Sequence, residues 1–110
     1  MSKSQRTKGK EFERKFVEFL RIYGHDAHRT SQQDKALDEA GVDILSDTKF
    51  HFQCKAVERV TMSHHQILND MPSDKIPVVV HKRNNKGTII AMKLIDFADL
   101  LLFKEQKNDD

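Results

Sequence analysis

The sequence predicts a single α/β domain of the α+β type, with a mixed central sheet flanked by helices. Three features carry this prediction. Apolar residues near the N-terminus recur at helical spacing, several later segments alternate apolar and polar residues as strands do, and turn signals separate these segments. The chain has 110 residues, of which 37% are hydrophobic and 33% charged, which is typical of one globular domain. We therefore expect one domain over residues 1–110.

The N-terminal half begins with a predicted helix over residues 8–23, where apolar residues recur at intervals of three and four. Gly24 is a typical residue to end it. The motif HDAHRT at residues 25–30 predicts a short strand. The polar segment SQQDKALDEAG at residues 31–41 has little to fix one conformation, and we expect a loop there.

The middle of the chain predicts a hairpin followed by a helix. Residues 42–45 and 50–57 alternate as two strands around the turn SDTK. Residues 61–71 predict a short helix, with Thr61 or Ser63 as its cap and a stop just before a proline.

The C-terminal part predicts two strands, residues 75–82 and 88–94, around the turn NNKG, and a last helix over residues 97–105 capped by Asp96. Apolar residues cover nearly the whole circumference of this helix, whereas a surface helix needs only one apolar face. Either the helix is wedged into its own domain or a second subunit covers it. The small size of the chain favours a homodimer.

Composition excludes several classes of protein. No apolar run approaches the roughly 18 residues of a transmembrane helix, and the first residues lack the apolar core of a signal peptide. We therefore expect a cytoplasmic protein without membrane contact. A single cysteine, Cys54, excludes an internal disulfide and a CxxC zinc pair. No pattern predicts a small-molecule cofactor.

The N-terminus is basic although the net charge of the chain is only +2. The first ten residues contain four cations and no acid: Lys3, Arg6, Lys8 and Lys10. Residues 1–7 are therefore expected to form a flexible basic arm. This arm is either a solvated tail or a contact for phosphate.

Hydrophobic pairing predicts the register of the first hairpin, because apolar residues must lie opposite apolar residues. A three-residue loop achieves this with the pairs Ser46–Phe50, Ile44–Phe52 and Val42–Cys54. The same register sets Asp43 opposite Gln53, and Lys55 shares the face of Gln53. These three polar residues should therefore form one cluster.

Glu13 is a further candidate, since it lies within the apolar arc of the first helix. A buried carboxylate costs several kcal/mol unless it is paired or binds a cation. It is thus a metal ligand, a flanking residue that reaches solvent, or the partner of Lys55 in a salt bridge.

Carboxylate and amide oxygens are ligands that Mg²⁺ or Mn²⁺ prefers. A lysine beside them can orient a metal-bound water or neutralise charge on an attacked phosphate. The cluster therefore predicts metal-dependent hydrolysis of a phosphodiester. The simpler alternative is an ordinary strand with an exposed polar face.

These motifs resemble the PD-(D/E)xK nuclease superfamily, and within it the small Holliday junction resolvases of archaea and phages. The resemblance covers most of the chain: K-G-x-x-x-E-R from Lys8 to Arg14, G-V-D-I with Asp43, Q-C-K with Gln53 and Lys55, and the hairpin at residues 77–94. It implies a restriction-endonuclease-like αβββαβ core followed by a C-terminal strand and helix.

The resemblance also implies roles for single residues. Asp43 is the bridging metal ligand, Gln53 stands where most members have an acidic ligand, and Lys55 is the catalytic lysine. Glu13 completes the catalytic site, and the backbone carbonyl of Cys54 is a further metal ligand. The Cys54 thiol is expected to face the core and to be inert. A neutral Gln53 should weaken metal binding.

The expected activity is that of a Mg²⁺-dependent endodeoxyribonuclease, a dimeric Holliday junction resolvase encoded by a phage or prophage. The alternatives are a nicking or repair endonuclease and a DNA-binding module with an impaired site. The expected DNA contacts are Arg6, Lys8, Lys10, Arg29, Ser31, Gln32 and Arg59.

Overall fold

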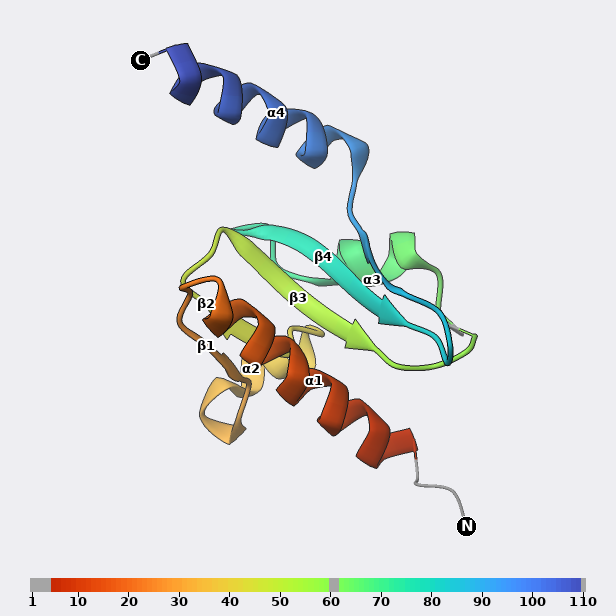
Figure 1. Cartoon of the computed structure of the whole chain (residues 1–110). Helices are drawn as coiled ribbons and strands as arrows, with labels where there is room; N and C mark the ends of the chain where they lie inside the picture. The colour runs from red at the N-terminus through yellow and green to blue at the C-terminus, as the bar shows by residue number, and fades with distance from the viewer. Residues whose placement is uncertain (1–4, 60–61, 110) are drawn as a thin grey trace.

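The structure is a computed structural model that describes the backbone of residues 5–59 and 62–109 and the side chains of residues 7–59 and 62–102. The fold is α+β, with a five-stranded mixed sheet and four helices (Figure 1). This confirms the predicted class.

The sheet has the strand order β1-β2-β3-β4-β5. Neighbouring strands are antiparallel except β3 and β4, which run parallel and are connected through a helix. The strands are β1 Ala27–Arg29, β2 Ile44–Ser46, β3 Phe50–Lys55, β4 Ile76–Lys82 and β5 Thr88–Ala91. The predicted strands are therefore all present, and several are shorter than expected.

Helices cover both faces of the sheet. Helix α1 (Gln5–Ile22) packs on β1 and β3, and helix α3 (His64–Asp70) packs on β4 from the other side (Figure 1). Each face has its own hydrophobic cluster. The cluster under α1 includes Phe12, Phe16, Leu20, Ile44, Phe52 and Val80, and the cluster under α3 includes Val42, Ile67, Leu68, Met71 and Val79.

Helix α1 confirms the amphipathic pattern but begins three residues earlier than predicted, at Gln5. Residues 5–7 are therefore helical, residues 1–4 lie outside the described residues, and the flexible basic arm stays a prediction. Gly24 follows the helix at φ +89°, and its N–H donates to the Arg21 carbonyl oxygen at 2.9 Å. This left-handed conformation is one that glycine adopts at little cost.

Residues 31–41 are not the loop that their polarity predicted. They contain a 3₁₀ turn (Gln32–Asp34) and helix α2 (Lys35–Glu39). Ser31 starts the turn through a capping box, in which its hydroxyl accepts from the N–H of Gln33 and the Asp34 carboxylate accepts from the N–H of Ser31. The S-x-x-D motif was the sequence signal for this turn.

The predicted helix at residues 61–71 is α3, and Ser63 caps it by accepting from the N–H of Gln66 at 3.1 Å. Thr61, the alternative cap, lies outside the described residues. The last helix, α4 (Leu94–Asp109), starts before the predicted position, so Asp96 lies in its first turn and is not its cap. The N–H of Asp96 already donates to the Lys93 carbonyl oxygen at 3.1 Å.

Helix α4 extends away from the sheet (Figure 1), which gives the molecule a length of 56 Å against 28 and 27 Å in the other directions. Leu94, Ile95 and Leu102 on α4 are 80, 67 and 57% exposed. The helix is thus not wedged into its own domain. In the described part of the chain, no helix has the length and apolarity that crossing a membrane requires.

Candidate functional site

The candidate site lies where β2 and β3 separate. Ile44 pairs with Phe52, as the hydrophobic pattern predicted. Beyond this pair the regular ladder ends: the Asp43 N–H donates to the Phe52 carbonyl oxygen at 2.8 Å, and the Asp43 carboxylate accepts the Cys54 N–H at 2.9 Å. A side-chain oxygen thus takes the place of a backbone acceptor, and this bond fixes the carboxylate beside β3.

Val42 departs from the predicted register. It was expected to face Cys54 in the cluster under α1, but it is fully buried in the cluster under α3, together with Ile67 and Met71. The N–H of Val42 donates to the Leu37 carbonyl oxygen at 2.9 Å, which ties this stretch to α2. The chain therefore leaves strand geometry at the residue that carries the carboxylate.

Gln53 and Lys55 contact one another on β3. With the amide oriented so that both of its groups are satisfied, the Gln53 oxygen accepts from Lys55 Nζ at 3.0 Å and its NH₂ donates to the Gly41 carbonyl oxygen at 3.1 Å. Gly41 has a φ of +92°, and a Cβ there would lie 2.7 Å from the end of the amide. Glycine therefore provides both the backbone conformation and the space for Gln53.

The carboxylate of Asp43 is poorly neutralised. Burial raises its pKa from 3.8 to about 7, against the lowering effect of the Cys54 N–H. The neighbouring charge of Glu13 contributes to this raised pKa, and Lys55 opposes it. Buried carboxylates with this imbalance are common at sites that bind cations or transfer protons.

Glu13 is held by Arg29, not by Lys55. Arg29 Nε donates to Glu13 Oε1 at 2.9 Å, and the two side chains are 36 and 20% exposed. The salt bridge with Lys55 considered from the sequence is therefore wrong. The reason is that β1 runs beside β2, with Arg29 opposite Ile44, and brings the guanidinium to the helix.

Asp38 is a site residue that sequence reasoning missed, because its segment was assigned to a loop. Its charge also raises the pKa of Asp43. The hydroxyl of Thr30 lies 3.3 Å from both the Asp38 carboxylate and the Asp43 carbonyl oxygen. Three acids thus lie in one small region: Glu13 of α1, Asp38 of α2 and Asp43, the residue before β2.

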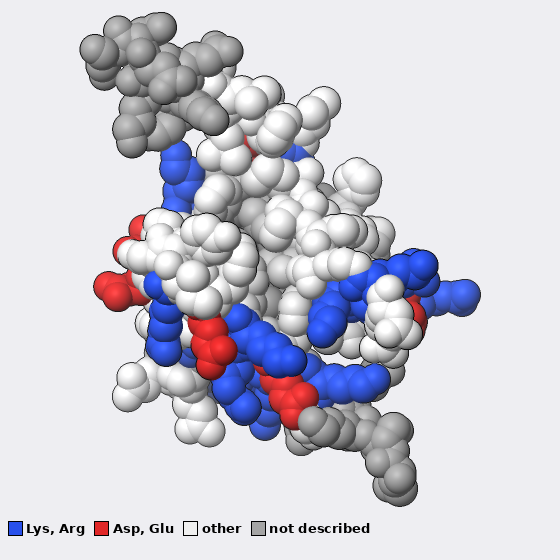
Figure 2. Space-filling model, in the orientation of Figure 1, with Lys and Arg blue, Asp and Glu red and all other residues white. Residues whose placement is uncertain are grey.

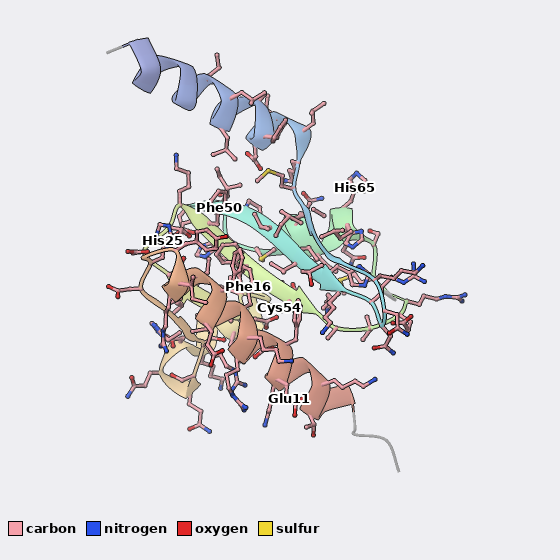
Figure 3. The ribbon with its side chains drawn as sticks, viewed as in Figure 1. Glu11, Phe16, His25, Phe50, Cys54 and His65 are labelled. Atoms are coloured by element: carbon pink, nitrogen blue, oxygen red, sulfur yellow. The ribbon has the colours of Figure 1, made fainter. Side chains whose placement is uncertain are left out.

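The side chain of Cys54 packs against the cluster under α1, and Figure 3 labels it beside this helix together with Phe16. Burial raises the pKa of this thiol far above its usual range, and the Asp43 and Glu13 charges add to the effect. The thiol is therefore protonated and unreactive, in line with the sequence expectation. The role of the Cys54 carbonyl stays a prediction.

The hydrogen bonds of the histidine side chains in the described residues do not involve Glu13, Asp38 or Asp43. His51 is buried at the start of β3, and its Nε2 bonds the Asp74 carboxylate at 2.8 Å. His81, beside Lys55 in the β3–β4 pairing, bonds the Val57 carbonyl oxygen through Nε2 at 2.8 Å. His65 lies on α3, with its side chain exposed (Figure 3).

Basic side chains gather along α1 and at the turn between β4 and β5 (Figure 2). A small groove is lined by Lys8 and Lys15 of α1 and Lys82 of β4. The other predicted DNA contacts are distributed differently. Lys10, Gln32 and Arg59 are exposed, Arg29 and Ser31 are engaged in bonds within the protein, and the side chain of Arg6 lies outside the description.

The donors present suit Mg²⁺ only in part. Across the described residues, no three side chains of His, Cys, Asp or Glu converge in a way that could hold a metal ion. Mg²⁺ is commonly bound by one or two carboxylates, with waters and substrate phosphates completing the shell. Asp43 and Glu13 match this pattern, and the incomplete neutralisation of Asp43 is the observation that favours a cation there.

An apolar groove of about 670 Å³ lies between α1, the sheet and the first turns of α4. Its lining includes Phe19, Tyr23, Phe50, Ile90, Phe97 and Leu100. Figure 2 shows the surface between α4 and the sheet as almost free of charge on this side. The groove is on the α1 face of the sheet, and Asp43 is not part of its lining.

No protein-family model matches the chain, and no curated protein and no solved structure is similar enough to match it.

Proposed function

We propose that the protein is a metal-dependent endodeoxyribonuclease with a restriction-endonuclease-like fold, and that branched DNA of the Holliday junction type is its substrate. The single observation that carries the proposal is Asp43. This carboxylate is fixed by a backbone N–H, is largely buried, and has an acidic neighbour in Glu13 and a lysine nearby in Lys55. A structural role alone does not explain why a fold would bury such a charge without a matching cation.

Asp43 and Glu13 would hold Mg²⁺ or Mn²⁺, with the Gln53 oxygen and the Cys54 carbonyl as neutral ligands. When bound, the metal supplies a water of lowered pKa and stabilises negative charge on the attacked phosphate. Lys55 positions the Gln53 oxygen through its 3.0 Å contact, and its ammonium is placed to neutralise charge on the phosphate. Protonated Asp43 is a poor ligand, so we expect cleavage to increase as the pH rises through about 7.

The same residues explain how a glutamine can replace an acid. The Gln53 NH₂ donates to the Gly41 carbonyl oxygen, a bond that a carboxylate could not make. The glutamine thus satisfies a backbone acceptor and still offers an oxygen to Lys55 or to a metal.

We also propose a homodimer, in which a second copy of the chain covers α4 and the apolar groove. The groove and the exposed apolar side of α4 lie next to one another, so a two-fold pair could place each helix against the groove of its partner. Light scattering at micromolar concentration should give twice the chain mass, and Leu102→Asp should give the monomer. A wild-type monomer would contradict the dimer without bearing on the site.

The activity is tested by incubating the protein with Mg²⁺ or Mn²⁺ and duplex, flap and four-way-junction DNAs. We expect cleavage of the junction, and loss of cleavage with retained DNA binding in Asp43→Asn and Lys55→Ala. Full activity in either variant would remove the assigned site. Preferred cleavage of flaps or nicked duplexes would indicate the repair-type endonuclease, and DNA binding without cleavage under any metal would indicate a DNA-binding module.

A further inference from the structure

Among the described residues of the candidate site, Arg29 and Glu13 form the one ion pair in direct contact. Only one nitrogen and one oxygen of this pair are hydrogen-bonded to each other. Nε of the guanidinium donates to Oε1 of the carboxylate at 2.9 Å. Within the described residues, the two terminal nitrogens of Arg29 and the Oε2 atom of Glu13 have no hydrogen-bond partner. The pair is partly exposed, so ligands can reach these atoms.

The position of the pair connects it with Asp43. Arg29 lies on β1, and the next residue, Thr30, donates its N–H to the Asp43 carbonyl oxygen at 2.9 Å. The charge of Glu13 acts on the Asp43 carboxylate, and Nε of Arg29 is bonded to Glu13. The pair therefore lies beside the Asp43 end of β3.

We propose that Arg29 is a positioning residue that couples DNA binding to metal binding. Through Nε it holds Glu13 with one carboxylate oxygen free for the metal, and through its terminal nitrogens it receives a DNA phosphate oxygen. Guanidinium groups have the planar fork geometry that such double use requires, and lysine does not. This inference rests on the proposed nuclease function and deepens it.

The coupling has a definite sign. Without DNA, the positive charge of Arg29 offsets the negative charge of Glu13 and weakens the attraction of Glu13 for a cation. When a phosphate takes up part of that positive charge, Glu13 becomes a better metal ligand. Metal and DNA should therefore strengthen each other's binding, by the same factor in both directions.

The test measures Mn²⁺ affinity by the electron paramagnetic resonance signal of free Mn²⁺, with and without a short four-way junction that carries phosphorothioate linkages to slow hydrolysis. In the wild type, DNA should lower the Kd for Mn²⁺, and the ratio of the Kd without DNA to the Kd with DNA is the coupling factor. In Arg29→Gln, this factor should fall at least about fivefold, in the usual range of coupling between sites. Arg29→Lys should keep much of the DNA affinity and still lose most of the factor.

Arg59→Gln is the matched control, because Arg59 is an exposed arginine without a carboxylate partner in the described structure. It should weaken DNA binding and leave the factor at the wild-type value. In Glu13→Gln the factor should already be reduced, and adding Arg29→Gln should lower it little further, since both changes break the same link.

The outcomes separate this inference from the proposed function. An unchanged factor in Arg29→Gln would overturn the role of Arg29 and leave the nuclease proposal in place. If the wild type binds no Mn²⁺ with or without DNA, the metal site itself is wrong, and the coupling is overturned with it. Mn²⁺ binding that DNA does not strengthen in the wild type would also overturn the coupling.

Discussion

The two ends of strand β3 each position a carboxylate, and the two carboxylates behave in opposite ways. At the end of the strand, the Cys54 N–H binds Asp43, whose pKa burial raises to about 7. At its start, His51 binds Asp74, and this hydrogen bond holds the pKa of the exposed Asp74 below its usual value. One strand thus supports one carboxylate that is costly to ionise and another that is easily ionised.

The difference shows how exposure and the available partner decide what a hydrogen-bonded acid does. Asp74 remains in water and gains a favourable contact, which is a structural role. Asp43 gives up most of its hydration and receives one N–H and the charge of Lys55 in return, so its charge stays incompletely balanced. The Asp43 end is therefore where a cation is expected.

The largest expected effect is on cleavage. Asp43→Asn should reduce cleavage of a four-way junction below detection, because it removes the charge that would bind the metal and keeps the acceptor for the Cys54 N–H. The isosteric change Asp74→Asn, at the other end of β3, should leave the cleavage rate close to wild type. Equal losses in the two variants would mean that β3 affects activity only through stability.

The second effect is on stability. Folding raises the pKa of Asp43 from 3.8 to about 7, so the folded state binds the proton more tightly and loses stability as the pH rises through this interval. At about 1.4 kcal/mol per pKa unit, the loss is at most about 4 kcal/mol. Asp43→Asn should therefore raise the midpoint of thermal unfolding at pH 8 and leave it nearly unchanged at pH 4.

Mg²⁺ provides the control for this measurement. If Asp43 binds the metal, Mg²⁺ should stabilise the wild type at pH 8 and have little effect on Asp43→Asn. If Asp43→Asn is no more stable than the wild type at pH 8 without Mg²⁺, Asp43 is better solvated than its burial indicates.

A smaller effect is expected from Gly41→Ala, which disturbs only the Asp43 end of β3. A non-glycine residue at a positive φ costs about 1–2 kcal/mol, and the new Cβ would also displace the Gln53 amide. Gly24→Ala is the matched control, since Gly24 has a φ of +89° and nothing within 4 Å of an added Cβ. Urea unfolding should show a larger loss for Gly41→Ala; equal losses would mean that Gln53 moves aside freely.

The smallest effect is expected at the His51 end. Asp74 contributes stability above the pKa it has in the unfolded chain and loses it as the pH falls, because its pKa in the folded state is lowered. Asp74→Asn should therefore lower the unfolding temperature slightly at pH 7, and by less as the pH falls below 3.8. This pH dependence has the opposite direction to that of Asp43→Asn, and thermal unfolding of both variants across pH tests the contrast directly.

Much of the fold could be predicted from local patterns. The spacing of Phe12, Phe16 and Leu20 predicted α1, and alternation predicted β3 and the pairing of Ile44 with Phe52. These predictions succeed because helical and strand periods appear in the order of residues along the chain. The polar segment at residues 31–41 was missed because its helix rests on a capping box and not on apolar periodicity.

By itself, the sequence determined that Ile44 pairs with Phe52 and that Gln53 and Lys55 share one face of β3, because the side chains of a strand alternate with a period of two. Only the tertiary structure decided which charges meet: that Glu13 pairs with Arg29, that Asp38 lies near Asp43, and that Val42 turns to the other face. Such contacts depend on where β1, α1 and α2 pack, over separations that local periodicity does not encode.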